Sequence, residues 1–61
     1  MGIKVKLVGE DGNAFAILGR VRKAMKTAKV DQKIIDQYMT EAKSGDYDHL
    51  LQTTMRYMDV E

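Results

Sequence analysis

Four polar side chains that could take part in chemistry, Ser44, Asp46, Asp48 and His49, lie within six residues of one another. Serine, histidine and carboxylate are the groups of a nucleophilic site, and histidine and carboxylates also bind metal ions. However, the sequence has no other serine, no second histidine and no cysteine. Neighbouring helical residues point about 100° apart, so Asp48 and His49 do not easily converge on one ion, although Asp46 and His49 could. Capping and the helix dipole explain both carboxylates, and so small a chain has little room for a substrate pocket. We therefore expect no enzyme, no metal site and no cofactor.

A glycine-containing turn at residues 9–12 stands between an expected strand and an expected helix, where phosphate-binding loops are found. Its spacing matches neither the dinucleotide fingerprint nor the P-loop, and no lysine follows Gly12. Glu10 and Asp11 would also repel a phosphate at short range. We therefore interpret the turn as structural and expect no small-molecule substrate.

A run of basic residues is the strongest candidate for a binding function. No acidic residue interrupts residues 14–30, and the basic side chains there are Arg20, Arg22, Lys23, Lys26 and Lys29. Such a face could contact nucleic-acid phosphates in a salt-dependent manner or bind an acidic partner protein. The face lacks an adjacent aromatic platform on which bases could stack. Nucleic-acid binding is therefore the alternative hypothesis rather than the first.

The charge of the chain is unevenly distributed. Residues 1–30 carry seven basic and two acidic side chains, a charge of +5, whereas residues 31–61 carry three basic and seven acidic ones, a charge of −4. The acidic half reduces long-range attraction to nucleic acid. The two halves could instead pair within one subunit or between two.

Periodicity predicts the elements that position these residues. A strand is expected over residues 3–8, because residues 3–7 alternate apolar and basic side chains, as a half-buried strand does. Three amphipathic helices are expected, at residues 14 to about 29, from residue 32 to about 44, and at residues 47 to about 58. Their expected N-caps are Asn13, Asp31 and Asp46, and Gly45 is expected to adopt the left-handed conformation that ends a helix.

The C-terminal segment has two interpretations. Helical spacing places Tyr47, Leu50, Leu51, Thr54, Met55 and Met58 on one face. Alternatively, the helix ends near Thr53, and residues 54–60 form a strand beside residues 3–8. A hairpin with residues 13–18 as its second strand is less favoured, because helical periodicity continues from Ala14 to Ala28.

Two motifs suggest a family. The stretches LVGEDGNAF at residues 7–15 and SGDYDHLL at residues 44–51 resemble a family of very short, uncharacterised proteins of bacteria and their phages. The resemblance implies a bacterial or phage source and a stand-alone small domain. It implies no activity, cofactor or site residue.

Composition limits the class of protein. With 44% apolar and 31% charged residues and no proline, the sequence is typical of a folded chain. The longest apolar run, residues 14–18, is too short to cross a membrane, and no signal peptide is recognised, so a cytoplasmic location is expected. A 61-residue domain buries only about 60% of the surface that its unfolded chain exposes, so oligomerisation would add useful stability.

These observations predict a single α+β domain over residues 1–61, with an N-terminal strand, three short helices and, in one interpretation, a C-terminal strand. The expected function is a non-enzymatic protein-interaction module that forms a homodimer. The expected association surface combines the strand edge with apolar helix residues: Ile3, Val5, Leu7, Met55 and Met58.

Overall fold

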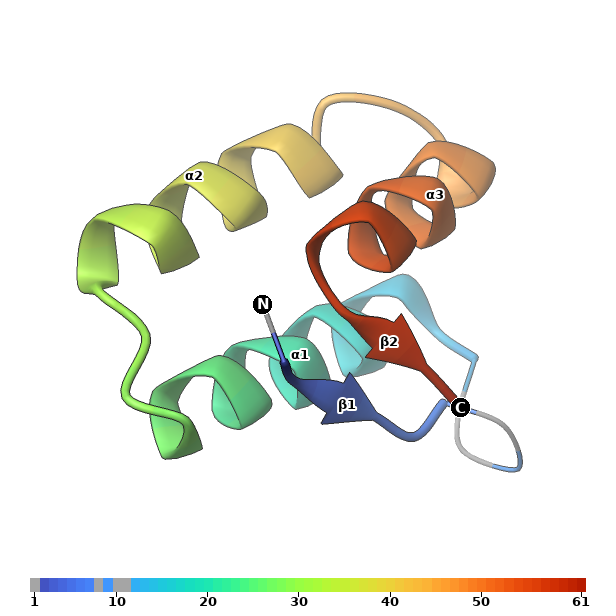
Figure 1. Ribbon diagram of the computed structural model, residues 1–61. Helices are drawn as coiled ribbons and strands as arrows, with labels where there is room; N and C mark the ends of the chain where they lie inside the picture. The colour runs from blue at the N-terminus through green and yellow to red at the C-terminus, as the bar shows by residue number, and fades with distance from the viewer. Residues whose placement is uncertain (1, 8, 10–11) are drawn as a thin grey trace.

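The computed structural model describes residues 2–7, 9 and 12–61 and shows an α+β fold, which confirms the predicted class (Figure 1). The elements are β1 (Lys4–Val5), α1 (Ala14–Thr27), α2 (Gln32–Ala42), α3 (Tyr47–Tyr57) and β2 (Asp59–Val60). The two strands lie side by side, with β1 against α1 and β2 against α3, and α2 packs on both other helices. No helix in the described part of the chain is long and apolar enough to span a bilayer.

The C-terminal segment combines both interpretations of the sequence. The helix continues to Tyr57, as the periodicity predicted, and the chain then forms the short strand β2. The strand spanning residues 54–60 is therefore wrong in length, because Thr54 is a buried helical residue. The hairpin alternative is also wrong, since residues 14–18 belong to α1.

Parallel pairing joins the two ends of the chain. Lys4 lies opposite Asp59 and Val5 opposite Val60. The amide of Asp59 donates to Ile3 O at 2.9 Å, and the amide of Glu61 donates to Val5 O at 2.8 Å. Parallel neighbours need a long crossover connection, and the three helices supply it. The predicted strand over residues 3–8 shortens to Lys4–Val5, and Val8 lies outside the described residues.

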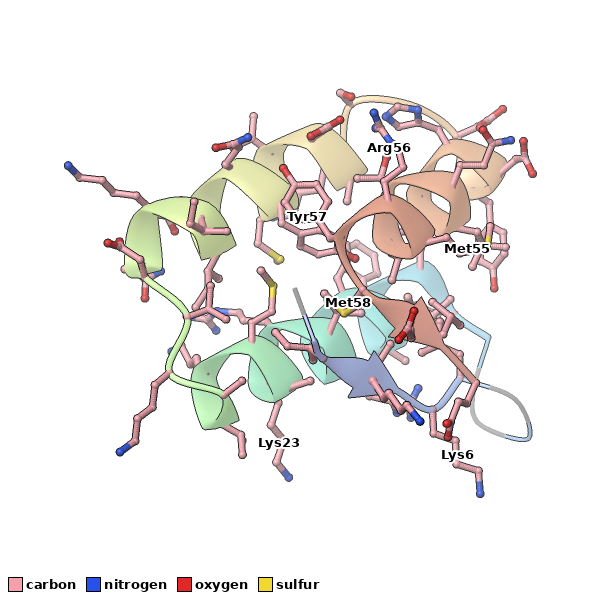
Figure 2. The ribbon with its side chains drawn as sticks, in the orientation of Figure 1. Lys6, Lys23, Met55, Arg56, Tyr57 and Met58 are labelled. Atoms are coloured by element: carbon pink, nitrogen blue, oxygen red, sulfur yellow. The ribbon has the colours of Figure 1, made fainter. Side chains whose placement is uncertain are left out.

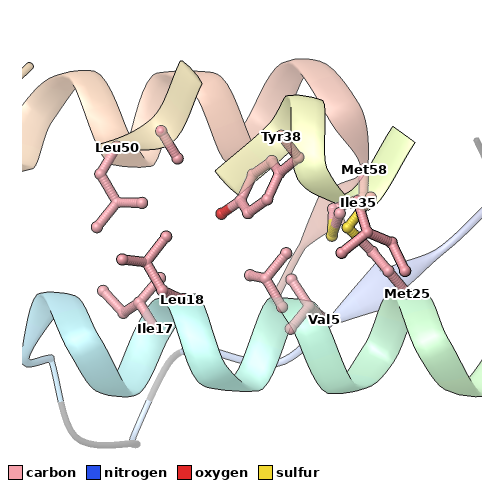
Figure 3. Close-up of a cluster of buried hydrophobic side chains, with 10 residues drawn as sticks. Val5, Ile17, Leu18, Met25, Ile35, Tyr38, Leu50 and Met58 are labelled. Atoms are coloured by element: carbon pink, nitrogen blue, oxygen red, sulfur yellow. The ribbon is translucent and has the colours of Figure 1, made fainter. Parts of the chain in front are cut away.

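The core is built from apolar side chains of all three helices and both ends of the chain (Figure 3). Helix α1 contributes at the spacing that the sequence predicted, because one stripe of an amphipathic helix faces inward. The buried apolar residues are Val5, Ile17, Leu18, Val21, Met25, Ile35, Tyr38, Ala42, Leu50 and Met58. One prediction for α3 is wrong: Met55 is 58% exposed, and Thr53 is buried instead.

All three predicted N-caps are confirmed. The side chain of Asn13 accepts a hydrogen bond from Phe15 N, that of Asp31 from Lys33 N, and that of Asp46 from His49 N. Each cap satisfies a backbone donor that the first helical turn leaves unpaired. The predicted turn at residues 9–12 is described only in part, because Glu10 and Asp11 lie outside the described residues, but Gly9 has a left-handed φ of 79°.

The prediction for Gly45 is wrong, because its φ is not positive. A side chain is excluded there for another reason: a Cβ atom on Gly45 would lie 2.8 Å from Cβ and Cγ of His49. The left-handed helix end occurs instead at Lys29, with φ of 60° after α1. Val30 N donates to Met25 O and Lys29 N donates to Lys26 O, both at 3.0 Å, which is the Schellman pattern.

Candidate interaction groove

The polar cluster of residues 44–49 connects the end of α2 to the start of α3. Nε2 of His49 lies 3.2 Å from Ser44 Oγ and 2.9 Å from the carbonyl oxygen of Glu41. A carbonyl oxygen only accepts hydrogen bonds, so Nε2 carries the proton and cannot take one from Ser44. The hydroxyl of Ser44 itself donates to Glu41 O at 2.7 Å. The geometry therefore supports a structural link rather than an activated nucleophile.

The same cluster contains side chains of the types that bind metal ions, Asp46 and His49. The carboxylate of Asp46 is engaged as the N-cap of α3. Across residues 2–7, 9 and 12–61, no group of three or more His, Asp or Glu side chains is arranged to hold a metal ion. Asp46 and His49 therefore act in this structure as a cap and its capped residue.

A second polar group on the helical side was not predicted from the sequence. Both carboxylate oxygens of Glu41 on α2 are engaged by α3: one pairs with Arg56, and the other accepts a hydrogen bond from Tyr57 Oη at 2.9 Å. Figure 2 shows Tyr57 between the two helices. The Tyr57 hydrogen bond, aided by Arg56, lowers the pKa of Glu41, whereas burial and the nearby carboxylate raise the pKa of Tyr57. These groups hold α2 and α3 together.

An open groove of about 450 Å³ lies between β1 and the second half of α1. Its floor is largely apolar, and basic side chains form its rim. Lys6 and Lys23 point to the same side of the molecule in Figure 2. The lining residues are Ile3, Lys4, Val5 and Lys6 from the strand segment and Arg20, Lys23, Ala24, Thr27 and Ala28 from the helix segment.

The groove runs along an open strand edge. Val5 pairs with β2 through its own N–H and C=O, and Leu7 N donates to Glu61 O. Backbone groups of alternate strand residues point to opposite edges, so the N–H and C=O groups of Lys4 and Lys6 point away from β2. In the part of the chain that the structure describes, the sheet has no third strand on that edge.

The structure divides the predicted basic face. Arg20 and Lys23 line the groove, whereas Arg22, Lys26 and Lys29 do not. The groove also recruits Lys4 and Lys6 of the strand, which the sequence reasoning did not treat as site residues. Their alternation with buried Val5 was the available signal, because it places both lysines on the solvent face of a strand.

The predicted association surface is corrected. Val5 and Met58 are only 4% and 3% exposed and belong to the core, so their side chains cannot contact a partner. Ile3 and Leu7 are half-buried against the same core, and Met55 alone of the five is well exposed. The sequence shows that these five side chains are apolar, but it does not show which of them the core buries.

A smaller hollow of about 220 Å³ lies where α1 and α3 begin. Phe15, which is 83% exposed, and Tyr47 contribute to its lining. Tyr47 is also structural, because its hydroxyl donates a hydrogen bond to Gly12 O. Gly12 suits this close approach, since a Cβ atom there would lie 3.3 Å from the tyrosine oxygen.

Comparisons with models of protein families, with curated proteins and with solved structures find no match to this chain. The bacterial or phage origin suggested by the two sequence motifs therefore stays a prediction. We therefore identify the groove between β1 and α1 as the candidate site from its geometry and charge alone.

Proposed function

We propose that this protein is a small, non-enzymatic interaction module that binds a partner protein in the groove between β1 and α1. One observation carries the proposal: an apolar floor and a basic rim lie along a strand edge whose outward N–H and C=O groups have no partner among the described residues. Apolar area supplies binding free energy, and the basic rim selects partners of opposite charge.

The homodimer expected from the sequence stays a prediction, and the lysines argue against β1 as its route. If two copies paired their β1 edges in an antiparallel manner, Lys4 and Lys6 would face the same lysines of the other copy. Like charges directly opposite one another destabilise paired strands. Lysines on an edge strand are also a common means of preventing such self-pairing. A different, acidic protein is therefore the favoured occupant.

Site-specific photo-crosslinking in an extract of the producing cell tests this proposal. A benzophenone amino acid replaces Thr27, which is exposed and lines the groove, and a matched control places it at exposed Gln52 on α3. We expect nuclease-resistant adducts from position 27 that disappear with Lys6→Glu/Lys23→Glu and are absent from position 52. Equal adducts from both positions, or a self-adduct of twice the chain mass as the only product, would overturn the proposal.

Nucleic acid is the second candidate, because exposed Arg22, Lys26 and Lys29 extend the basic surface beyond the groove. Phosphate contacts would give binding to generic duplex DNA or RNA that weakens steeply as salt rises. Under this alternative, Lys23→Glu/Lys26→Glu should abolish binding and leave the fold intact. Nuclease-sensitive adducts from position 27 would favour this function over the protein-binding one.

A further inference from the structure

We infer, building on the function proposed above, that the occupant of the groove is an extended acidic segment that adds a third strand to the free edge of β1. Strand addition is a recurring way for a sheet edge to bind peptides, with main-chain hydrogen bonds supplying affinity and alternate side chains supplying specificity. Three features of the groove support this occupant: its backbone groups, its floor and its charge.

The backbone groups come first. Lys4 and Lys6 each direct one N–H and one C=O away from β2, and no hydrogen bond to these groups exists among the described residues. An added strand would pair with both residues at the spacing that a sheet requires. A helical occupant offers no free backbone groups for this edge, because its own turns use them.

The floor selects the side chains of the added strand. Successive side chains of a strand point to opposite faces. Those facing α1 would lie over Ala24, Thr27 and Ala28, which are small and leave room for apolar side chains. Those on the other face would lie beside the side chains of Lys4 and Lys6. The occupant therefore alternates apolar and acidic residues.

The charges agree with this pattern. Neither Lys6 nor Lys23 has an ion-pair partner in the described part of the chain, and both are exposed. Lys4 has a weak exposed partner, Glu61, at 3.7 Å. An acidic strand would meet two uncompensated cations and could replace Glu61 at the third. A basic or neutral strand would gain none of these contacts.

The probe is a fluorescein-labelled hexapeptide of alternating Glu and Val, measured by fluorescence anisotropy with the intact protein. We expect Lys6→Glu/Lys23→Glu to weaken binding at least tenfold and a Lys–Val peptide not to bind. Two further peptides carry N-methyl groups on either all Glu or all Val amides. Because only alternate amides face β1, one of the two should lose binding at least tenfold while the other retains it.

Amide hydrogen exchange gives an independent measurement. Saturating Glu–Val peptide should slow exchange at Lys4 and Lys6 at least tenfold, with Val5, which is already paired with β2, as the internal reference. Binding that ignores both methylation patterns and leaves these two amides unchanged would overturn strand addition, although the proposed function would stand. Absence of peptide binding would also overturn it, whereas the photo-crosslinks test the function separately.

Discussion

The α2–α3 side of the molecule and the β1–α1 side use their polar groups in opposite ways. Between α2 and α3, both carboxylate oxygens of Glu41 are engaged, and Nε2 of His49 reaches the same residue's carbonyl. Between β1 and α1, Lys6 and Lys23 face solvent beside an apolar groove and an open strand edge.

The difference shows which polar residues belong to the fold. Residues 41–49 contain a histidine, a serine and several carboxylates, the residue types of a candidate active site. Their hydrogen bonds within the chain show that they position two helices. Lysines on a strand look like ordinary surface residues, yet they border the groove and their backbone groups have no partner in the described part of the chain. Partners within the chain, rather than residue type, therefore identify the polar groups that serve the fold.

Replacement of the buried Tyr38, between α2 and α3, should cause the largest loss of stability. Tyr38 packs edge-on against Tyr57 with ring centroids 5.2 Å apart, and its hydroxyl is 2.7 Å from Thr54 Oγ1. Thr54 Oγ1 already donates to Leu50 O, so Tyr38 is the donor in this pair. Tyr38→Ala should lower the free energy of unfolding by about 3–5 kcal/mol, as removal of a large buried ring does. Urea unfolding measures this.

A smaller change keeps that prediction testable if Tyr38→Ala does not fold. Tyr38→Phe retains the ring and removes only the hydroxyl, so it should cost about 1–2 kcal/mol, the usual cost of removing a buried hydrogen-bond donor. Wild-type stability in Tyr38→Phe would show that the hydroxyl pair does not hold α2 to α3.

The next largest loss of stability should follow from adding a methyl group where Gly45 contacts His49. Gly45→Ala should destabilise the protein by about 1–3 kcal/mol, because the new methyl group overlaps Cβ and Cγ of His49. Gly19→Ala is the matched control: Gly19 is a helical residue of α1 with nothing within 4 Å of an added Cβ. That variant should gain about 0.5–1 kcal/mol. Equal thermal shifts in the two variants would contradict this role of Gly45.

The turn after α1 offers a stabilising change. Lys29 has a left-handed φ of 60°, which costs a non-glycine residue about 1–2 kcal/mol. Lys29→Gly should therefore raise the free energy of unfolding by about 1 kcal/mol. Lys23→Gly removes the same charge from an exposed position in the interior of α1 and should instead lower it by about 1 kcal/mol. Chemical unfolding of both variants decides between a backbone effect and a charge effect.

A smaller, pH-dependent effect concerns Glu41. Its pKa is lowered from the ordinary value of 4.5, chiefly by the hydrogen bond from Tyr57. The carboxylate therefore stabilises the fold above pH 4.5, and this contribution is lost as the pH falls through the lowered pKa. Glu41→Gln should flatten this acid dependence of the melting temperature between about pH 2 and pH 5, the range in which a carboxyl group with a lowered pKa takes up its proton. Parallel wild-type and variant curves would contradict the assignment.

Substitutions on the β1–α1 side should change stability the least. Lys6→Glu/Lys23→Glu should change the free energy of unfolding by less than about 0.5 kcal/mol, because both side chains are exposed and unpaired among the described residues. A large destabilisation in urea would show instead that the groove lysines support the fold.

Features determined by neighbouring residues were evident in the sequence alone. The caps Asn13, Asp31 and Asp46 and the buried stripe of α1 depend on contacts within one or two helical turns, so the local pattern is sufficient to predict them. The same holds for the short N-terminal strand. Its alternation shows that Val5 faces inward, although it cannot show where the ladder stops.

Tertiary structure alone decided the features that join distant parts of the chain. Thr53 rather than Met55 is buried because α3 is rotated to pack against α2. The chain after α3 forms the strand β2 because β1 offers hydrogen bonds there. The groove has the same origin: Lys4 and Lys6 meet Arg20 and Lys23 only after β1 docks on α1. No local pattern contains that docking, because it is the sum of many weak long-range contacts.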